Sequence, residues 1–355
     1  MIRRILKCVM FLLLVVMILA GIGVLYLTIV EYSPKDVEAV APTGTAAGSL
    51  QAGDTIHLLS WNLGYGALGD NADFFMDGGT MVQTADEARV RQNLTDIQGF
   101  LTAEAPDLAF LQETDINSDR SYHIDERALL TAAMPEHQSL FAYNFNAAYV
   151  PYPVPPIGHV ESGLVTFSRY PVSEGSRMQL PCPFTWPVRL VNLKRCLLVS
   201  RIPVKGTSKE LVAVNLHLEA YDDGAGKAAQ TAMLASFLKA ELDKGNYVIV
   251  GGDFNQIFSS ADQSKWPVRA GMWAPGLIEV NDFDPRLSLL MDGRVPTCRS
   301  LDRAYTGADL SNFQYYLIDG FIVSDNLRVE KLETVQLDFV ATDHNPVRLA
   351  VTLLD

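Results

Sequence analysis

The sequence predicts an α/β domain whose sheets are covered by a few helices, preceded by one membrane-spanning helix. Short apolar runs typical of buried strands are numerous along the 355-residue chain, whereas stretches with helical spacing of apolar residues are few. This ratio favours packed sheets with helices outside them over a simple alternating parallel fold. Hydrophobic residues make up 48% of the chain, which is enough for a large buried core.

The first thirty residues form a separate apolar segment. Arg3, Arg4 and Lys7 precede an uncharged stretch of 23 residues from Cys8 to Val30, and about 20 residues suffice to cross a bilayer as a helix. Because basic residues precede this stretch and acidic residues follow it, we expect a single-pass protein of the cell membrane with its C-terminal part outside the cytoplasm. A cleaved signal peptide is the alternative, but its apolar region is shorter, about 7–15 residues. An uncleaved anchor is therefore favoured.

The segment after the anchor is rich in small and polar residues. Residues 31–54 contain mainly Pro, Ala, Gly, Thr and Ser, a composition typical of a flexible stalk. Neither a second linker nor an internal repeat follows. The sequence therefore predicts three parts: a cytoplasmic N-terminus with the anchor in residues 1–30, a stalk in 31–54 and one catalytic domain in 55–355.

Apolar periodicity locates the elements of this domain in order. Helical spacing predicts one helix over Val90–Leu101 and a second over Met233–Leu242. Strands are expected at Ile56–Trp61, Leu108–Leu111, Gly163–Phe167, Leu197–Ile202, Leu211–Leu218, Tyr247–Val250, Leu317–Val323 and Val347–Leu353.

Polar side chains follow six of these strands or lie at their ends. They are Trp61-Asn62, Gln112-Glu113, Asn215-Leu216-His217, Gly252-Asp253-Phe254-Asn255, Ile318-Asp319 and Asp343-His344. Each segment alone has an ordinary structural explanation, such as a turn residue, a solvated strand end or a hydrogen-bonded core histidine. Together they offer a proton acceptor, neutral donors for phosphoryl oxygens and oxygen ligands for a cation. This combination predicts metal-assisted attack on a phosphoester.

The order of these segments, with Ser-Arg-Tyr-Pro at 168–171 between them, resembles the endonuclease/exonuclease/phosphatase superfamily over about Ile56 to Asp355. The resemblance implies a DNase I-like, four-layer α/β/β/α sandwich of two mostly antiparallel sheets. It also implies hydrolysis of a phosphoester with Mg²⁺, or with Mn²⁺ or Ca²⁺ in its place.

The resemblance also assigns metal and substrate contacts. Glu113 is then the direct metal ligand, with Asn62 supporting the metal or its waters and Asp343 acting through water. A hard cation with oxygen ligands that keeps several waters suits this set. Tyr149 and Asn146 are the candidate phosphate contacts.

Five further residues are catalytic candidates on the same basis. Asp253 orients or deprotonates the attacking water, while Asn255 and His217 donate to the phosphate. Asp319 holds His344, which acts on the phosphate or in proton transfer. An Asp that fixes a histidine tautomer is a common arrangement.

Charge limits the substrate. The net charge is −13, and nucleic-acid binding draws mainly on basic surface. We therefore expect an extracytoplasmic phosphodiesterase or phosphatase that acts on a phospholipid headgroup or small phosphoester. A surface nuclease and a non-catalytic binding protein of the same fold are the alternatives. The membrane is the expected partner through the N-terminal helix, and no protein partner is inferred.

Two Pro-rich loops carry aromatic residues. They are Tyr149–Ile157 and Leu180–Pro187, and proline excludes both from central strands. They either pack as rigid covers over the sheets or place Tyr152, Phe184 and Trp186 at a pocket or at the bilayer, where aromatic residues are favoured.

Overall fold

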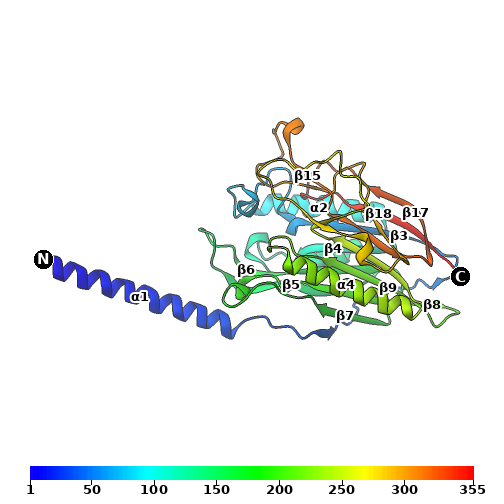
Figure 1. The fold of residues 1–355 in the computed structure, drawn as a ribbon, viewed down its shortest axis with the longest axis horizontal. Coiled ribbons are helices and arrows are strands. Elements are labelled where there is room, and N and C mark those ends of the chain that lie inside the picture. The colour runs from blue at the N-terminus through cyan, green and yellow to red at the C-terminus, as the bar shows by residue number, and fades with distance from the viewer.

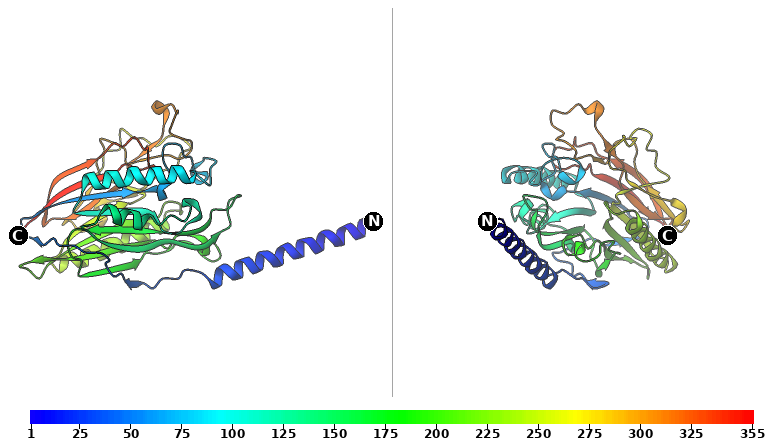
Figure 2. Two further views of the ribbon diagram at one scale, coloured as in Figure 1. Left: turned by 180° about the vertical axis from the view of Figure 1, so that it is seen from behind. Right: turned by 60° about the vertical axis from the view of Figure 1, so that its left-hand side comes forward.

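The computed structural model describes residues 1–355 and contains two β-sheets packed face to face (Figures 1 and 2). The first sheet has the order β1 (Val37–Ala39), β7 (Glu174–Gln179), β8 (Cys196–Lys205), β9 (Glu210–His217), β10 (Tyr247–Asp253), β16 (Asp319–Ser324), β13 (Leu287–Leu290), with β2 (Leu50–Gln51) beside β8. The second has the order β17 (Leu327–Thr334), β18 (Val347–Leu353), β3 (Thr55–Asn62), β4 (Leu108–Asp115), β6 (Gly158–Ser168), β5 (Gln138–Val150). Most neighbouring strands are antiparallel, and the parallel pairs are β3–β4, β9–β10 and β2–β8.

Helices cover the outer face of each sheet. The helices α2 (Glu87–Glu104) and α3 (Glu126–Ala133) pack on the second sheet, and α4 (Ala225–Asp243) packs on the first. Two short strand pairs, β11 (Gln256–Phe258) with β12 (Gly276–Ile278) and β14 (Cys298–Arg299) with β15 (Tyr315–Tyr316), lie outside the main sheets. The predicted four-layer α/β/β/α sandwich is therefore confirmed.

The main core fills the space between the sheets, as β10 illustrates. Its residues Tyr247 and Ile249 face the other sheet, whereas Val248 and Val250 face α4. Alternate side chains of a strand point to opposite faces, so β10 supplies both apolar layers. Each fully buried large apolar side chain contributes about 1.5–3 kcal/mol relative to exposure.

Helix α2 shows how local sequence sets an element. Asp86 precedes the helix, and its side chain accepts a hydrogen bond from the backbone N–H of Arg89 at 2.8 Å, which satisfies one of the free donors at the helix start. The predicted stripe of Val90, Leu94, Ile97 and Leu101 is fully buried against the second sheet. The spacing-based prediction of this helix, and of α4, is confirmed.

Residues 31–54, which the sequence predicted to be a flexible stalk, pair with the domain in the structure. Within residues 31–54, β1 pairs with β7 and β2 pairs with β8. Leu50 is only 2% exposed and belongs to the core between the sheets, and Thr43 bridges Ser139. The backbone of this segment forms hydrogen bonds with polar backbone groups of the sheets that would otherwise lack a partner. The segment therefore lies against the domain despite its linker-like composition.

The N-terminal helix α1 (Ile2–Ile29) extends away from the sandwich (Figure 1). Its mean hydropathy is 3.0 and none of its apolar window is buried, so it is long and apolar enough to cross a membrane. An N-terminal signal sequence meets the same description. All four cysteines of the chain are free thiols.

Candidate active site

Strand register brings three predicted residues into one row on the first sheet. Asp253, the last residue of β10, pairs with His217 of β9 on one side and with Asp319 of β16 on the other. Parallel pairing of β9 with β10 places both carboxyl ends at the same edge, and β16 begins there because it runs in the opposite direction. The three side chains are all buried.

The second sheet adds a ligand-type carboxylate at the same edge. Glu113 in β4 has a positive φ of 51°, and the pairing of β4 with β6 shifts register between Leu111 and Thr114. A bulge of this kind re-aims a side chain. The neighbouring Gln112 donates through Nε2 to Asn215 Oδ1 of the other sheet at 2.8 Å, so a buried hydrogen bond ties the two sheets together beside the site.

Asn62 and His217 connect the two halves of the cluster. Asn62 Nδ2 donates to Glu113 Oε1 at 3.2 Å and to Asp253 Oδ2 at 3.0 Å. His217 Nε2 lies 3.5 Å from Asp253 Oδ2, and its Nδ1 lies 4.0 Å from Glu113 Oε1. The four side chains therefore form one contact group contributed by β3, β4, β9 and β10.

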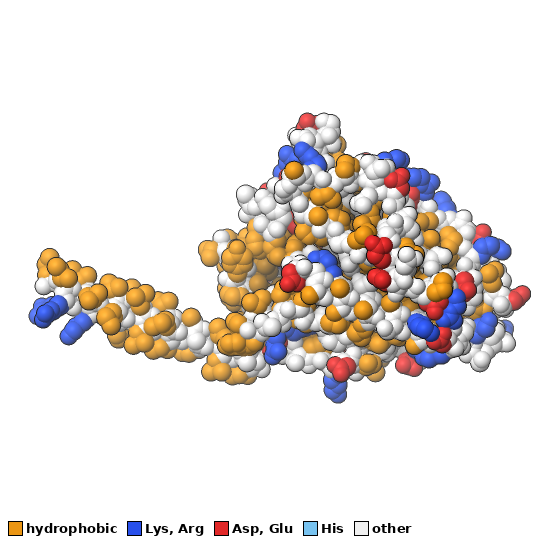
Figure 3. All heavy atoms as spheres, in the orientation of Figure 1, with side chains coloured by type: hydrophobic (Ala, Val, Ile, Leu, Met, Phe, Trp, Pro, Cys, Tyr) orange, Lys and Arg blue, Asp and Glu red, His pale blue; other side chains and the backbone are white.

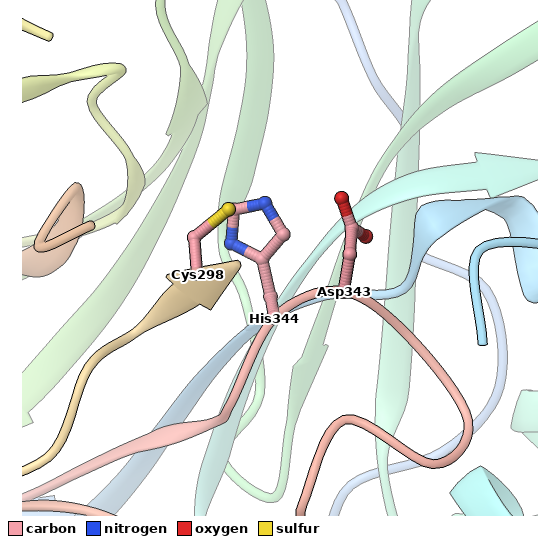
Figure 4. A group of neighbouring side chains, drawn as sticks. All are labelled: Cys298, Asp343 and His344. Carbon is pink, nitrogen blue, oxygen red and sulfur yellow. The ribbon is translucent and has the colours of Figure 1, made fainter. Parts of the chain in front are cut away.

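The loop before β18 closes the site. His344 Nδ1 lies 2.8 Å from Asp319 Oδ2, and His344 Nε2 lies 3.7 Å from Asp253 Oδ2. Trp61 Nε1 donates to the carbonyl of His344 at 2.9 Å and fixes this loop against β3. Figure 4 shows Asp343 and His344 pointing to the same side of the loop, with Cys298 beside the imidazole. The expected Asp319–His344 pair is thus a direct contact.

The Gly-Gly-Asp-Phe-Asn segment has a steric requirement for its second glycine. Gly252 has φ +154°, and a Cβ there would lie 2.0 Å from the carbonyl oxygen of Leu216. No other residue fits without moving β9. Beyond the glycine, the backbone N–H of Asn255 donates to Asp253 Oδ1 at 2.9 Å, and Asn255 Nδ2 donates to the carbonyl of Leu218. The segment therefore fixes Oδ1 of the Asp253 carboxylate, and Asn62 of β3 holds Oδ2.

Burial sets the protonation of the carboxylates. It raises the pKa of Asp253 to about 7, and the nearby charge of Asp319 adds to the rise. Burial also raises the pKa of Glu113 and of Asp343, and for Glu113 the charge of Asp343 acts in the same direction. Buried carboxylates that oppose each other's ionisation are typical of a cation-binding or catalytic site.

The two histidines differ in charge. Burial lowers the pKa of His217 well below its usual value, and Arg195 acts in the same direction. Burial alone would lower the pKa of His344 as well, but the charge of Asp319 outweighs it, and the pKa of His344 is raised well above its usual value. His217 is therefore neutral near pH 7, whereas His344 is charged.

The donors at this edge fit a hard divalent cation. Glu113 and Asp343 supply carboxylate oxygens, the ligand type that Mg²⁺ prefers, and Asn62 holds Glu113 Oε1 through its Nδ2. A second group, Cys298 with Asp343 and His344, has its ligand atoms within 4.8 Å of one another. However, sulfur is a soft ligand that Mg²⁺ does not prefer, and burial raises the pKa of the Cys298 thiol to about 12. The oxygen set is therefore the better candidate.

The cluster lies on the floor of a cavity of about 690 Å³. The predicted residues on its lining are Glu113, His217, Asp253, Asn255, Asp343 and His344. Of its 37 lining residues, 21 are hydrophobic. A mostly apolar pocket with a few convergent polar groups is the usual form of a small-molecule site.

The two predicted substrate contacts lie outside the cavity lining. Asn146 and Tyr149 lie on β5 but do not line the cavity, whereas Asn144, Phe145 and Val150 of the same strand do. The pairing of β5 with β6 shifts register twice, between Tyr143 and Phe145 and between Ala147 and Val150. Each bulge changes which side chains face the cavity, and sequence alone does not locate bulges.

Two arginines on the lining, Arg120 and Arg195, were not anticipated. Arg195 is 3% exposed, and its Nε lies 3.2 Å from Glu219 Oε2. Arg120 lies over the ring of Tyr65 at 3.6 Å and pairs with Asp115 at 2.9 Å. Neither belongs to a recognisable motif. Both place positive charge at the cavity of an acidic protein.

A two-sheet sandwich with carboxylates, amides and histidines gathered at one edge defines a DNase I-like α/β protein. The chain belongs to the endonuclease/exonuclease/phosphatase family, whose family model matches residues 59–344. Members of this family are generally phosphoester hydrolases that depend on divalent metals. A search of curated protein sequences found no match.

Solved structures support the fold. An endonuclease/exonuclease/phosphatase from Beutenbergia cavernae is 20% identical with a TM-score of 0.54, covering 84% of this chain and 72% of that one. The human Nocturnin catalytic domain with bound sulfate is 15% identical with a TM-score of 0.52, covering 88% and 97%. D. rerio TDP2 complexed with a single-strand DNA product is 15% identical with a TM-score of 0.51, covering 84% and 99%.

Proposed function

We propose that this protein is an extracytoplasmic, Mg²⁺-dependent phosphodiesterase or phosphatase whose substrate is a phospholipid headgroup or a small phosphoester. The observation that carries this proposal is the contact of His344 with Asp319 at 2.8 Å, directly beside Asp253 on the cavity floor. A charged histidine next to a carboxylate of pKa about 7 provides an acid and a base at neutral pH.

Asp253 is the proposed group that orients and deprotonates the attacking water. Its two oxygens accept hydrogen bonds from the Asn255 backbone and from Asn62, so the carboxylate has a fixed direction. A pKa near the working pH gives a base that is ionised when needed and still able to take a proton.

His217 and His344 are the proposed donors to the phosphoryl oxygens, with Asn255 beside them on the lining. His217 is neutral and donates one N–H, whereas charged His344 supplies a stronger hydrogen bond. Asp319 holds His344 through Nδ1 and leaves its Nε2 directed toward Asp253. Removing one fixed donor aimed at developing negative charge typically lowers turnover by roughly 100- to 1,000-fold.

Glu113, Asn62 and Asp343 are the proposed residues that hold the divalent cation. When bound, Mg²⁺ stabilises negative charge on the phosphoryl oxygens, and Mn²⁺ or Ca²⁺ are alternatives with the same oxygen preference. The mutual repulsion of Glu113 and Asp343 supports this assignment, because a cation would relieve it.

The cavity and the charge favour a small or amphiphilic substrate over a polynucleotide. Most of the lining is hydrophobic, and the chain carries 41 acidic against 28 basic residues. Arg120 and Arg195 on the lining provide local attraction for one phosphate but no basic stripe for a strand. A surface nuclease remains the second candidate, since a structural neighbour holds a DNA product.

The proposal is tested with the purified full-length chain in detergent. Hydrolysis is measured with Mg²⁺ on bis(p-nitrophenyl) phosphate, on phospholipids, on phosphomonoesters and on single- and double-stranded DNA, with His344→Ala and EDTA as controls. We expect turnover of a lipid or small phosphoester that EDTA and His344→Ala both abolish. DNA cleavage alone would favour the nuclease, and no metal-dependent turnover of any substrate would favour a non-catalytic binding protein.

A further inference from the structure

We propose that the mouth of the cavity lies in the outer leaflet of the membrane that α1 spans, so that a lipid phosphoester enters the site directly from the bilayer. We define the apolar mouth as the exposed side chains of Met76, Tyr152, Val154, Trp186 and Val188. The inference rests on the proposed function for the hydrolysis and on α1 as a span for the membrane.

The hydrophobic side chains of the apolar mouth are largely exposed to solvent. Val154 is 94% exposed, Tyr152 68%, Trp186 54% and Val188 52%. Figure 3 shows hydrophobic side chains gathered at the end of the domain from which α1 emerges. Contiguous apolar patches of this kind mark interaction surfaces, and Trp and Tyr are enriched where a protein meets the membrane interface.

Three loops form this surface as one unit. The ring of Phe75 lies 5.8 Å from the ring of Tyr152 at the tip of the β5–β6 hairpin, in an edge-to-face arrangement. Val191, at the end of the short helix that begins at Val188, packs on the apolar cluster of Val150 in the same hairpin. The loops therefore support each other and hold their exposed residues on one side.

The end of α1 is attached directly to this surface. Trp186 Nε1 donates to Thr28 Oγ1 at 3.1 Å, one residue before the helix ends. Glu31, just past the helix, pairs with Arg189 and with Lys194, each at 3.2 Å. Because the indole N–H of Trp186 contacts the last turn of the proposed span, the mouth stands at the depth of the membrane surface.

The length of α1 agrees with this depth. Its 28 residues at about 1.5 Å each give roughly 42 Å, longer than the hydrocarbon core of about 30 Å. The basic residues Arg3, Arg4 and Lys7 occupy the opposite end, so Thr28 falls in the interface of the other leaflet. Figure 1 shows the β5–β6 tip directed toward the side of α1.

The apolar mouth is continuous with the cavity wall. Tyr152 and Val188 are partly exposed and also line the cavity, together with Phe184. The polar floor with His344 lies at the inner end of the same cavity. This layout suits an amphiphile: its phosphoester reaches the floor while its apolar part stays against the wall or in the leaflet. The substrate class is therefore a membrane phospholipid.

Depth of insertion is tested by fluorescence with the full-length chain in phosphatidylcholine vesicles. We expect lipids brominated near the headgroup end of the acyl chain to quench tryptophan emission, and Trp186→Phe to remove most of that quenching. The other tryptophans lie within the domain, and Trp61 is buried. Equal quenching in wild type and Trp186→Phe, or none in either, would overturn the docking.

Function at the membrane is tested with a double variant, Val154→Asp with Trp186→Ser, which changes no residue on the cavity lining. Loss of two exposed apolar side chains that insert into the leaflet in the proposal should lower hydrolysis of vesicle lipid by roughly tenfold or more. Hydrolysis of bis(p-nitrophenyl) phosphate should stay unchanged within twofold. The matched control is Val329→Asp, at a site 36% exposed on β17 at the far end of the domain (Figure 1).

The outcomes separate the two proposals. Unchanged vesicle-lipid hydrolysis in the double variant overturns the docking and leaves the phosphoesterase standing. Quenching by brominated lipid without hydrolysis of any phosphoester supports the docking and refutes the proposed function.

Discussion

The floor of the cavity is polar, buried and set on strand ends, whereas its mouth is apolar, exposed and set on loops. On the floor, Asp253 is 2% exposed and has partners on both oxygens. At the mouth, Val154 is 94% exposed and occupies a hairpin tip. The contrast indicates a division of labour: the sheets hold the chemistry in fixed geometry, and the loops determine where and on what the chemistry takes place.

The largest expected effect comes from removing floor residues. His217→Ala and Asp253→Ala should each reduce turnover by roughly 100-fold or more on soluble and on vesicle substrates alike, because each removes a positioned donor or base. Steady-state kinetics on both substrates measures this. Near wild-type turnover in either variant would show that the floor residue has no catalytic part.

The proposed metal ligands come next. Glu113→Gln should raise the Mg²⁺ concentration for half-maximal activity by roughly 10- to 100-fold, because an amide replaces the charged oxygen beside Asn62. A Mg²⁺ titration of activity, with metal binding followed by calorimetry, measures the change. Unaltered Mg²⁺ dependence in this variant would place the cation elsewhere.

The link between the sheets should have a smaller effect, on stability. Asn215 accepts from Gln112 and donates to the carbonyls of Leu111 and Val165. Asn215→Leu leaves these groups unpaired, and each buried unpaired group costs about 1–3 kcal/mol. Chemical denaturation should show the lower free energy of unfolding. The comparison is Val212→Ala, which removes apolar side-chain volume from the core on the same strand and should leave the metal dependence of the site unchanged. If Asn215→Leu is as stable as wild type, the cross-sheet bonds do not fix the floor.

The smallest expected effect is a pH-dependent gain in the stability of the metal-free protein when Asp253 is replaced by Asn. Burial raises the folded-state pKa of Asp253 to about 7, above the unfolded value of about 3.9. Ionisation of Asp253 therefore lowers the free energy of unfolding of the metal-free protein. This loss of stability is absent below about pH 4 and complete above about pH 7. Asp253→Asn with EDTA should raise the melting temperature by a few degrees at pH 8 and little at pH 4. An equal change at both pH values would contradict the raised pKa.

The sequence predicted the floor better than the mouth. His217, Asp253 and Asp319 were identified because each ends or begins a strongly apolar strand, and strand register then brings them together. Glu113 was identified by motif, but its positive φ and the bulge that turns its side chain were not. Bulges depend on how two strands pair, which local residue patterns do not show.

The mouth could not be derived because its features are tertiary. The composition of the Pro-rich loops with Tyr152 and Trp186 was compatible both with rigid covers, which it favoured, and with a lipid contact. Only the contact of Trp186 with Thr28 shows that one of them meets the end of α1. The strand β5 was missed because its apolar residues alternate with Asn and Tyr, and the segment with Leu50 was taken for a stalk on composition alone.

The measurement that tests the account most directly is the ratio of vesicle-lipid to soluble-diester hydrolysis by the full-length protein. The comparison is made for wild type, for the Val154→Asp/Trp186→Ser variant and for His344→Ala. We predict that the mouth variant loses only the lipid reaction and that His344→Ala loses both. An unchanged ratio in the mouth variant, or soluble-diester turnover that survives in His344→Ala, would contradict the division between a catalytic floor and a membrane-facing mouth.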